Sequence, residues 1–389
     1  MKFRYLKVDA ESNTLYNCHA AAPNPVDFVW LSQNSGQLFN TVTNVRERGM
    51  MLRNERNTSC EQNCWLAEDN QAVSPRMYQN GTAKTHTDTV TTPDMIEFTS
   101  TSDCNLTCSY CTKEYSSAWR QDILRNGAYQ IDNFENSRYQ LLARDTLLSK
   151  VSQPQLKQST RYQQLVSETV KIADSNTHLI ITGGEPLLDI NLEKNLDLFQ
   201  HVRTIEIFTG LGVSHARFRK VLDAVSKRPN VTFTVSAESV GSNFEFNRYG
   251  NTWHEFVSKI EYLQQHAVAF KFNCTLTNLT LLSWFDFVEH FCQVPYVYQF
   301  VYHPNFLAPY VLDNHTKDRI RDRLRQMSHV LVPDLDKQRI LQSITADPDP
   351  RVVTNLRQFL QQFVERRTNI STEIYGNQFA QWLAQIDFG

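Results

Sequence analysis

The sequence lacks any run of about 18 or more apolar residues, and this absence argues against a membrane-spanning helix. Residues 1–7 lack the apolar stretch that a secretion signal needs. A large charge excess is also missing: the net charge at pH 7 is −2, so no global field draws the chain to nucleic acid or to a membrane. These absences predict a cytoplasmic protein, in which thiols stay reduced.

The 389 residues contain no internal repeat and no low-complexity tract. This excludes repeat architectures and collagen-like chains. Hydrophobic residues make up 41% of the chain and charged residues 21%, as in globular proteins. At about 150 residues per domain, the length predicts two or three domains. A chain this long can bury a large core, so it needs no disulfide framework.

Short apolar runs rich in strand-forming residues alternate with helical patterns from Met95 onwards. Because strands that alternate with helices form parallel sheets, this rhythm predicts an α/β fold. The runs span residues 95–98, 178–182, 204–209, 231–235, 267–272 and 296–301. Six such units are too few for a closed eight-stranded barrel, which needs about 250 residues. We therefore predict a partial (β/α)6 TIM-like barrel over residues 93–303.

Two segments flank this barrel. Residues 1–92 are irregular, with a strand-like run at residues 28–31 and a group of cysteines, and are predicted to form an N-terminal module. Residues 304–389 carry apolar residues at helical spacing and are predicted to form a helical C-terminal segment. Two or three helices are expected within residues 112–177, because a simple connection between two strands is far shorter.

Five cations lie close together in the C-terminal segment. They are Lys317, Arg319, Arg321, Arg323 and Arg325. Such a density is typical of a nucleic-acid contact. Asp318 and Asp322 interleave with the cations, however, so we favour a solvated helix face on which opposite charges alternate.

Eight cysteines are present, and six of them lie within the first 111 residues. Clustered cysteines in a reducing compartment are candidate metal ligands or redox groups. The pattern Cys104-x3-Cys108-x2-Cys111 directly follows the first predicted strand. A short loop can place three such thiolates around one face of an iron–sulfur cubane and leave the fourth iron open. A zinc site, or three buried apolar cysteines, are the alternatives.

A glycine-rich turn, Thr182-Gly-Gly-Glu-Pro-Leu187, lies at the carboxyl end of the second predicted strand. Ligands of α/β proteins bind at that edge of the sheet. Two adjacent glycines let the backbone approach a ligand closely. Glu185 is expected either to stabilise the turn or to accept a hydrogen bond from an ammonium group. An ordinary strand-to-helix turn is the alternative for this motif taken alone.

The two motifs together, each at a strand end, resemble those of the radical S-adenosylmethionine (SAM) superfamily over residues 93–303. The resemblance implies that Cys104, Cys108 and Cys111 hold a [4Fe-4S] cluster, whose open iron is chelated by S-adenosylmethionine. It implies that the glycine-rich turn contacts the methionine amine, that Tyr110 lies near the adenine, and that residues after later strands meet the ribose and carboxylate. The implied cofactor-binding residues are Tyr110, Gly183, Gly184, Glu185, Pro186, Thr209, Ser236, Glu238 and Arg248.

The same resemblance implies an activity. An electron donor such as flavodoxin or ferredoxin reduces the cluster, S-adenosylmethionine is cleaved, and a 5′-deoxyadenosyl radical abstracts hydrogen from a substrate C–H. Our leading expectation for the substrate is a peptide or protein. Modification of a nucleoside or sugar is one alternative, and a non-catalytic zinc-binding structural protein is another.

A second cysteine group comprises Cys18, Cys60 and Cys64. With Trp65, Glu68 and residues 74–76 it resembles the auxiliary-cluster ("twitch") module of radical SAM proteins from phage and environmental sequences. So do residues 116–119, which follow the cysteine loop. This resemblance implies a second iron–sulfur cluster; zinc or no metal are the alternatives.

The remaining two cysteines, Cys274 and Cys292, stand apart from both groups. Isolated cysteines behave as small apolar residues, so both are predicted to be buried.

Overall fold

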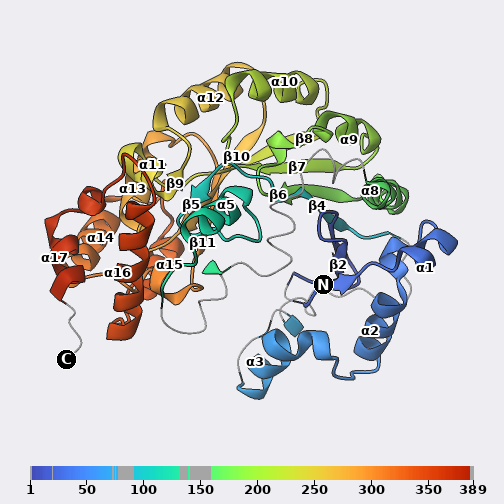
Figure 1. Cartoon of the computed structure of the whole chain (residues 1–389), viewed down its shortest axis with the longest axis horizontal. Coiled ribbons are helices and arrows are strands. Elements are labelled where there is room, and N and C mark those ends of the chain that lie inside the picture. The colour runs from blue at the N-terminus through green and yellow to red at the C-terminus, as the bar shows by residue number, and fades with distance from the viewer. Residues whose placement is uncertain are drawn as a thin grey trace. The chain divides into compact units, whose positions relative to one another are not determined.

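The computed structural model describes residues 2–19, 21–71, 74, 76–77, 92–131, 139–140 and 159–385. The chain divides into two compact units. The first unit comprises Met1–Ser102, Val151–Phe208 and Arg219–Thr232, and the second comprises Asp103–Lys150, Thr209–Phe218 and Phe233–Gly389. Strands and helices occur in both (Figure 1). Pro75, which is part of the auxiliary-module resemblance, lies outside the described residues.

The first unit contains a mainly parallel sheet. Its strands are β1 (Tyr5–Asp9), β2 (Thr14–Tyr16), β3 (Asn24–Pro25), β4 (Met95–Thr101), β6 (His178–Gly183) and β7 (Thr204–Thr209, of which the residues up to Phe208 belong to this unit). They lie in the order β7-β6-β4-β1-β2-β3, and β7, β6, β4 and β1 are parallel. The predicted strands at residues 95–98, 178–182 and 204–209 are therefore confirmed. Strand β1 comes from a segment that was expected to be irregular, and it pairs with β4.

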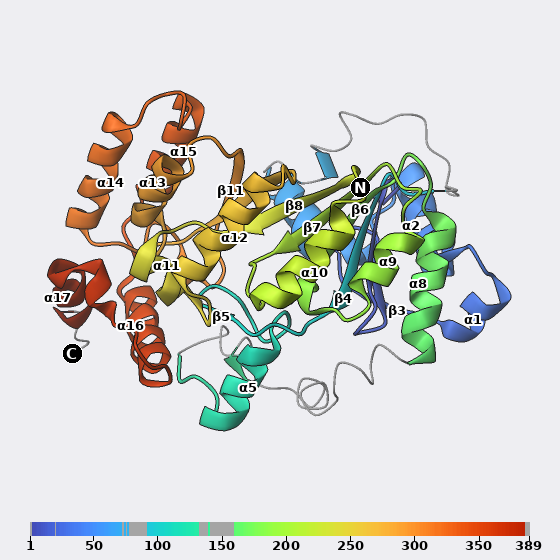
Figure 2. The same cartoon turned by 90° about the horizontal axis from the view of Figure 1, so that it is seen from above.

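The first unit also contains several helices. They are α1 (Phe28–Gln33), α2 (Val42–Leu52), α3 (Leu66–Asp69), α8 (Thr160–Ile172) and α9 (Leu192–Leu198), with short 3-10 helices at Leu38–Asn40, Thr58–Cys60 and Pro186–Leu188 and a π-helical turn at Glu61–Trp65. Helices α8 and α9 lie beside β4 and β6 (Figure 2). The ring of Phe98 on β4 lies 6.5 Å from Tyr162 of α8 and 6.3 Å from Phe199, just after α9. This aromatic cluster joins the helices to the strands.

The strand predicted at residues 28–31 is wrong, because this run forms α1. The side chain of Asp27 accepts hydrogen bonds from the backbone N–H groups of Val29 and Trp30, both at 3.0 Å. An N-cap of this kind satisfies donors that a helix start leaves without partners. A short apolar run is compatible with either structure, so the capping residue decides it.

The second unit contains a parallel sheet and a short antiparallel pair. The parallel strands are β8 (Val231–Ser236, of which the residues from Phe233 belong to this unit), β10 (Phe270–Leu276) and β11 (Tyr296–Phe300). The antiparallel pair consists of β5 (Thr107–Cys108) and β9 (Arg248–Tyr249). The strand predicted at residues 267–272 begins later, because Ala267 has a φ of 51° and forms the turn after the preceding helix.

Helices make up the rest of this unit. They are α5 (Ser117–Asn126), α11 (Gly241–Asn247), α12 (Trp253–Gln265), α13 (Leu281–His290), α14 (Asn314–Gln326), α15 (Asp334–Ser343), α16 (Pro350–Glu365) and α17 (Asn377–Gln385), with 3-10 helices at Asn305–Leu307 and Thr372–Tyr375. Helix α10 (His215–Val225) contains residues of both units. The helices after β11 form one group around α14, α16 and α17 (Figure 1), as the apolar periodicity predicted. No helix in the described ranges is long and apolar enough to cross a membrane.

The α/β class with parallel strands is confirmed. Closure into a partial barrel and the boundaries after residues 92 and 303 stay predictions. Cys274 is buried as predicted, whereas Cys292 is exposed, contrary to prediction, because it follows the last turn of α13. The solvated helix face predicted for residues 317–325 is wrong for Lys317. This side chain is buried, and its ammonium donates to the carbonyl of Ala346 at 2.7 Å.

Candidate functional site

The cysteine loop leads from β4 of the first unit into the second unit. Cys104, Cys108 and Cys111 are all free thiols; Cys108 is buried, and the other two are partly exposed. The loop closes on itself, because the N–H of Cys111 donates to the carbonyl of Cys108 at 3.0 Å. Strand β5 places Cys108 opposite Arg248 of β9. These backbone contacts define the conformation of the loop.

Helix α5 begins soon after the loop and turns back onto it. The indole N–H of Trp119 donates to the carbonyl of Cys108 at 3.0 Å. The hydroxyl of Ser116, the N-cap of α5, donates to the carbonyl of Leu106 at 2.7 Å. The N–H of Ala118 donates to the carbonyl of Cys104 at 3.0 Å. These contacts hold three loop carbonyls, and they give residues 116–119 a local role.

Two glycines of the second unit allow the loop to pack tightly. A Cβ on Gly212 would lie 2.9 Å from the side chain of Leu106. A Cβ on Gly250, which has a φ of 106°, would lie 2.8 Å from the carbonyl oxygen of Asn105. Neither position accepts a side chain without displacing the loop. Sequence reasoning did not single out Gly212, whose place soon after a predicted strand was the available signal.

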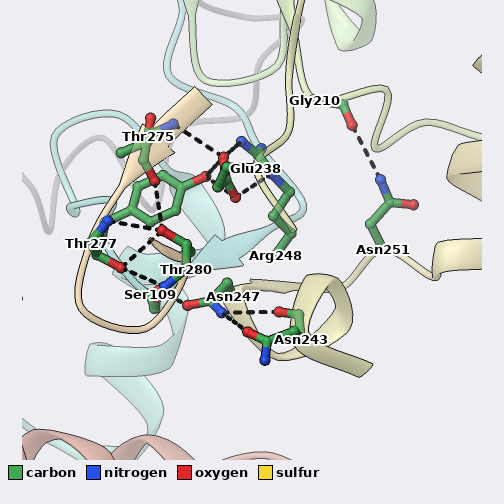
Figure 3. Close-up of polar contacts among 11 residues, drawn as sticks. Ser109, Gly210, Glu238, Asn243, Asn247, Arg248, Asn251, Thr275, Thr277 and Thr280 are labelled. Carbon is green, nitrogen blue, oxygen red and sulfur yellow. Dashed lines mark hydrogen bonds and ion pairs between the residues drawn. The ribbon is translucent and has the colours of Figure 1, made fainter. Parts of the chain in front are cut away.

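A buried ion pair lies beside Cys108. Glu238 is fully buried, and its two carboxylate oxygens accept from Arg248 at 3.1 and 2.8 Å. The hydroxyl of Tyr110 donates to the same carboxylate, 3.0 Å from each oxygen. The N–H of Thr275 adds a fourth donor at 3.4 Å (Figure 3). The structure thus brings three predicted cofactor-binding residues, Tyr110, Glu238 and Arg248, close to the predicted cluster ligand Cys108. Two N–H donors of Arg248 bond to Glu238.

Burial and the ion pair set the protonation of this site. Burial raises the pKa of the Cys108 thiol to about 12, and the positive charge of Arg248 opposes this rise. Burial also raises the pKa of Tyr110 well above its usual range, so its hydroxyl stays neutral and donates. Cys108 is therefore a neutral thiol when it binds nothing. It must lose its proton to become a metal ligand.

Asn247, the residue before Arg248, holds the opposite side of the loop. Its carbonyl accepts from the N–H of Ser109 at 2.9 Å, and its side-chain oxygen accepts from the Ser109 hydroxyl at 2.7 Å. Its amide nitrogen donates to the carbonyl of Asn243 and to the hydroxyl of Tyr375, each at 3.0 Å. Figure 3 shows Asn247 between Ser109 and Asn243. Sequence reasoning missed Asn247, because a single asparagine carries no motif.

The glycine-rich turn lies in the first unit at the end of β6. Gly183 has a φ of 141°, and a Cβ there would lie 2.1 Å from the carbonyl oxygen of Thr101. The N–H of Gly184 donates to the same oxygen at 2.8 Å. Glu185 is buried and accepts from the N–H of Leu187 at 3.1 Å, which caps the 3-10 helix that begins at Pro186. The turn-stabilising interpretation of Glu185 is therefore seen directly.

Thr209 and Ser236, the other predicted cofactor-binding residues, lie at strand ends in the second unit. Thr209 is buried, and its hydroxyl oxygen accepts from the N–H of Leu211 at 2.9 Å. Ser236 is the last residue of β8 and is half-buried. The contacts of Thr209 have a local reason, and a ribose contact by either residue stays a prediction.

The second cysteine group is brought together in the first unit. Cys18, Cys60 and Cys64 are all buried. Burial raises the pKa of Cys60, the neighbouring Cys64 and Cys18 raise it further, and the charge of Lys2 acts in the opposite direction. Lys2 itself is 2% exposed and donates to Glu47 and to the hydroxyl of Ser59. Three thiols and a buried cation therefore share one region.

Two buried N–H donors next to these cysteines have no hydrogen-bond partner among the described residues. They are the side-chain amide of Asn57 and the indole of Trp65, which adjoins Cys64 in the chain. A buried donor without a partner costs about 1–3 kcal/mol. A thiolate- and sulfide-rich cluster would supply acceptors at this point. The donor set therefore fits an anionic iron–sulfur group.

In the part of the chain that the structure describes, no three histidine, cysteine or acidic side chains converge as they would around one metal ion. A cubane sets a different requirement, because each cysteine binds a different iron.

Residues 98–282 match the family model of the Radical SAM superfamily. This match agrees with the superfamily that the two motifs indicated, whose members are enzymes. No curated protein matches the chain. Among solved structures, "Native anSMEcpe with bound AdoMet" is 15% identical over 52% of this chain and 50% of its own, with a TM-score of 0.35. Streptococcus suis SuiB bound to S-adenosylmethionine is 13% identical over 82% and 66%, with a TM-score of 0.32.

Proposed function

We propose that Cys104, Cys108 and Cys111 hold the [4Fe-4S] cluster of this radical SAM enzyme and that the Gly183–Pro186 turn binds the methionine part of S-adenosylmethionine. When bound, these groups supply one-electron reduction and a 5′-deoxyadenosyl radical that takes hydrogen from an unactivated C–H. The observation that carries the proposal is the cysteine loop, whose backbone is held by hydrogen bonds from α5, β9 and Asn247 and whose three cysteines form no disulfide.

The residues around the loop have distinct roles in this proposal. Arg248 places a positive charge beside Cys108 and favours its thiolate. Glu238 keeps the guanidinium oriented through two hydrogen bonds. Tyr110 donates to the same carboxylate and stays neutral. A ligand site that is already positioned loses less freedom on binding, so the cysteine loop is suited to retain its cluster.

The second cysteine group supports an auxiliary cluster and, through it, the substrate class. Cys18, Cys60 and Cys64 would be its ligands, and the donors of Asn57 and Trp65 would bond its sulfurs. The twitch-type modules that this group resembles accompany peptide and protein modification. We therefore propose a peptide or protein substrate, with an electron donor of the flavodoxin or ferredoxin type.

Anaerobic reconstitution with iron and sulfide tests the cluster assignment. The protein should turn brown, with a visible absorbance that bleaches on adding dithionite. Incubation with S-adenosylmethionine and dithionite should yield 5′-deoxyadenosine. Cys108→Ala should abolish this product, whereas Cys292→Ala, at an exposed cysteine outside the loop, should leave it unchanged. Persistent product in Cys108→Ala contradicts the assignment.

Metal analysis tests the auxiliary site separately. Cys64→Ala should lower the iron content per chain while the cysteine loop keeps its own cluster. Zinc in stoichiometric amount in the purified protein would favour the structural-zinc alternative instead.

A further inference from the structure

A cavity of about 390 Å³ lies in the second unit beyond the carboxyl ends of β8 and β10. Its walls come from the start of α11, from α13 and α14, and from the segment between Ile374 and Phe379. Binding sites in α/β proteins occur at this edge of the sheet. The volume falls in the range of small-ligand pockets, about 300–1,000 Å³. None of the residues assigned above to the cluster or to S-adenosylmethionine lines this cavity.

The wall of the cavity is apolar on one part and polar on another. Leu279, Leu282, Leu312 and Phe379 supply apolar surface. The charged residues of the wall are Asp286 and Arg319. Such a wall suits a ligand with an apolar body and a polar end, because apolar area is removed from water while the polar end keeps a partner.

The uncompensated charge of the cavity is positive. Asp286 is already paired with Arg323 at 2.7 Å. The other arginines of α14 are paired too, Arg321 with Asp318 and Arg325 with Asp322. Arg319 has no ion-pair or hydrogen-bond partner among the described residues. The one arginine of this helix that faces the cavity is thus available to bind an anion.

A second cavity of about 350 Å³ adjoins the first and shares Ser242 and Ile374 with it. It is lined by Glu245, Phe246 and residues 369–371. Two cavities that share lining residues suit an extended chain better than one compact molecule, because only an extended ligand reaches both.

The cavity wall connects to the cysteine loop through hydrogen bonds. Tyr375 and Asn243 line the cavity, and both accept from the side-chain amide of Asn247. The side-chain oxygen of Asn247 accepts from Ser109, which lies between Cys108 and Tyr110. An occupant of the cavity would therefore lie against residues that position the cluster ligands.

We propose that this cavity binds the C-terminal end of a peptide or protein. The terminal carboxylate of the peptide pairs with Arg319, and its last side chain, which is apolar, packs against Leu282 and Phe379. The preceding residues of the peptide follow the adjoining cavity. The assignment rests on the proposed peptide substrate and names the part of it that is recognised. Arg suits a carboxylate because its planar fork bonds both oxygens.

Isothermal titration calorimetry of the full-length protein tests the assignment without reductant or S-adenosylmethionine. The probes are N-acetyl-Ala-Ala-Leu-Phe with a free carboxylate, the same peptide as its C-terminal amide, and N-acetylphenylalanine. The free-carboxylate peptide should bind, and amidation should weaken binding about 10-fold or more, as expected for a charge-assisted hydrogen bond. Arg319→Met should weaken binding of the carboxylate peptide equally and leave little difference between the two peptides.

The matched control is Arg325→Met, which removes an exposed arginine of the same helix that does not line the cavity. It should bind like the unchanged protein. Equal binding of amide and carboxylate, no effect of Arg319→Met, or no binding up to about 1 mM peptide overturns the assignment. Binding of N-acetylphenylalanine as tight as that of the tetrapeptide overturns the peptide part and leaves a site for small apolar acids.

The two proposals fail in different ways. Formation of 5′-deoxyadenosine without peptide binding would retain the radical SAM assignment and overturn this one. Peptide binding without 5′-deoxyadenosine would do the reverse.

Discussion

The buried pair of Glu238 and Arg248 offers the sharpest test of how the site is built. Replacing Glu238 with Gln keeps the shape of the side chain but leaves the guanidinium, 3% exposed, without a balancing charge. Breaking one partner of a buried ion pair typically costs about 3–5 kcal/mol, because the other charge stays in a low-dielectric interior. We expect a loss of free energy of unfolding of this size in Glu238→Gln.

The chain contains a matched control with the same chemistry and nearly the same geometry. Arg53 donates Nε and Nη2 to the two carboxylate oxygens of Glu55, both at 2.9 Å, as Arg248 does to Glu238. Both side chains of this second pair are exposed, 60% and 48%. Solvent screens such a pair, so Glu55→Gln should leave the unfolding midpoint unchanged.

Urea unfolding of the anaerobic, cluster-free protein measures both variants. A double variant, Glu238→Leu with Arg248→Met, adds a second check, because removing both charges of a buried pair is often neutral or stabilising. It should recover most of the stability that Glu238→Gln loses. Equal effects of Glu238→Gln and Glu55→Gln, or a double variant no more stable than the single one, would refute the reasoning.

Three further outcomes are expected. Gly183→Ala should lower the free energy of unfolding by more than about 3 kcal/mol and abolish S-adenosylmethionine binding, because its Cβ would lie 2.1 Å from a backbone oxygen. Gly127→Ala, also at positive φ but with nothing within 4 Å, carries backbone strain alone and should lose less, about 1–3 kcal/mol, in the same urea titration; equal losses would contradict the clash. Trp119→Phe should lower the free energy of unfolding by about 1 kcal/mol, because one hydrogen bond to the carbonyl of Cys108 disappears. This variant should also release iron faster to a chelator, and unchanged release would contradict the role of Trp119 in holding the loop. Burial alone would raise the pKa of Glu97, but Lys7, at 2.7 Å, lowers this pKa below the usual value of 4.5. The carboxylate therefore stabilises the fold above about pH 4.5, and this contribution is lost as the pH falls through the folded-state pKa. In Glu97→Gln the free energy of unfolding should depend less on pH in that acidic range, and an unchanged dependence would contradict the assignment.

Local patterns were informative wherever the chemistry itself is local. The cysteine spacing and the glycine-rich turn each lie within a few residues, and both motifs lie at strand ends in the structure. Most predicted strands were found because the apolar residues of a parallel strand are consecutive in the chain. The run at residues 28–31 failed because one capping residue, Asp27, outweighed the apolar pattern.

By itself, the sequence determined the parallel α/β class, and it indicated the superfamily, the three candidate cluster ligands and the turn expected to bind methionine. Only the tertiary structure decided that Arg248 pairs with Glu238, that Asn247 links Ser109 to Tyr375, and that Arg319 is the unpaired arginine of its helix. The physical reason is that the partner of a charge or of a hydrogen-bond donor is set by distance in space. Asn247 and Ser109 are 138 residues apart in the chain, and no local pattern joins them.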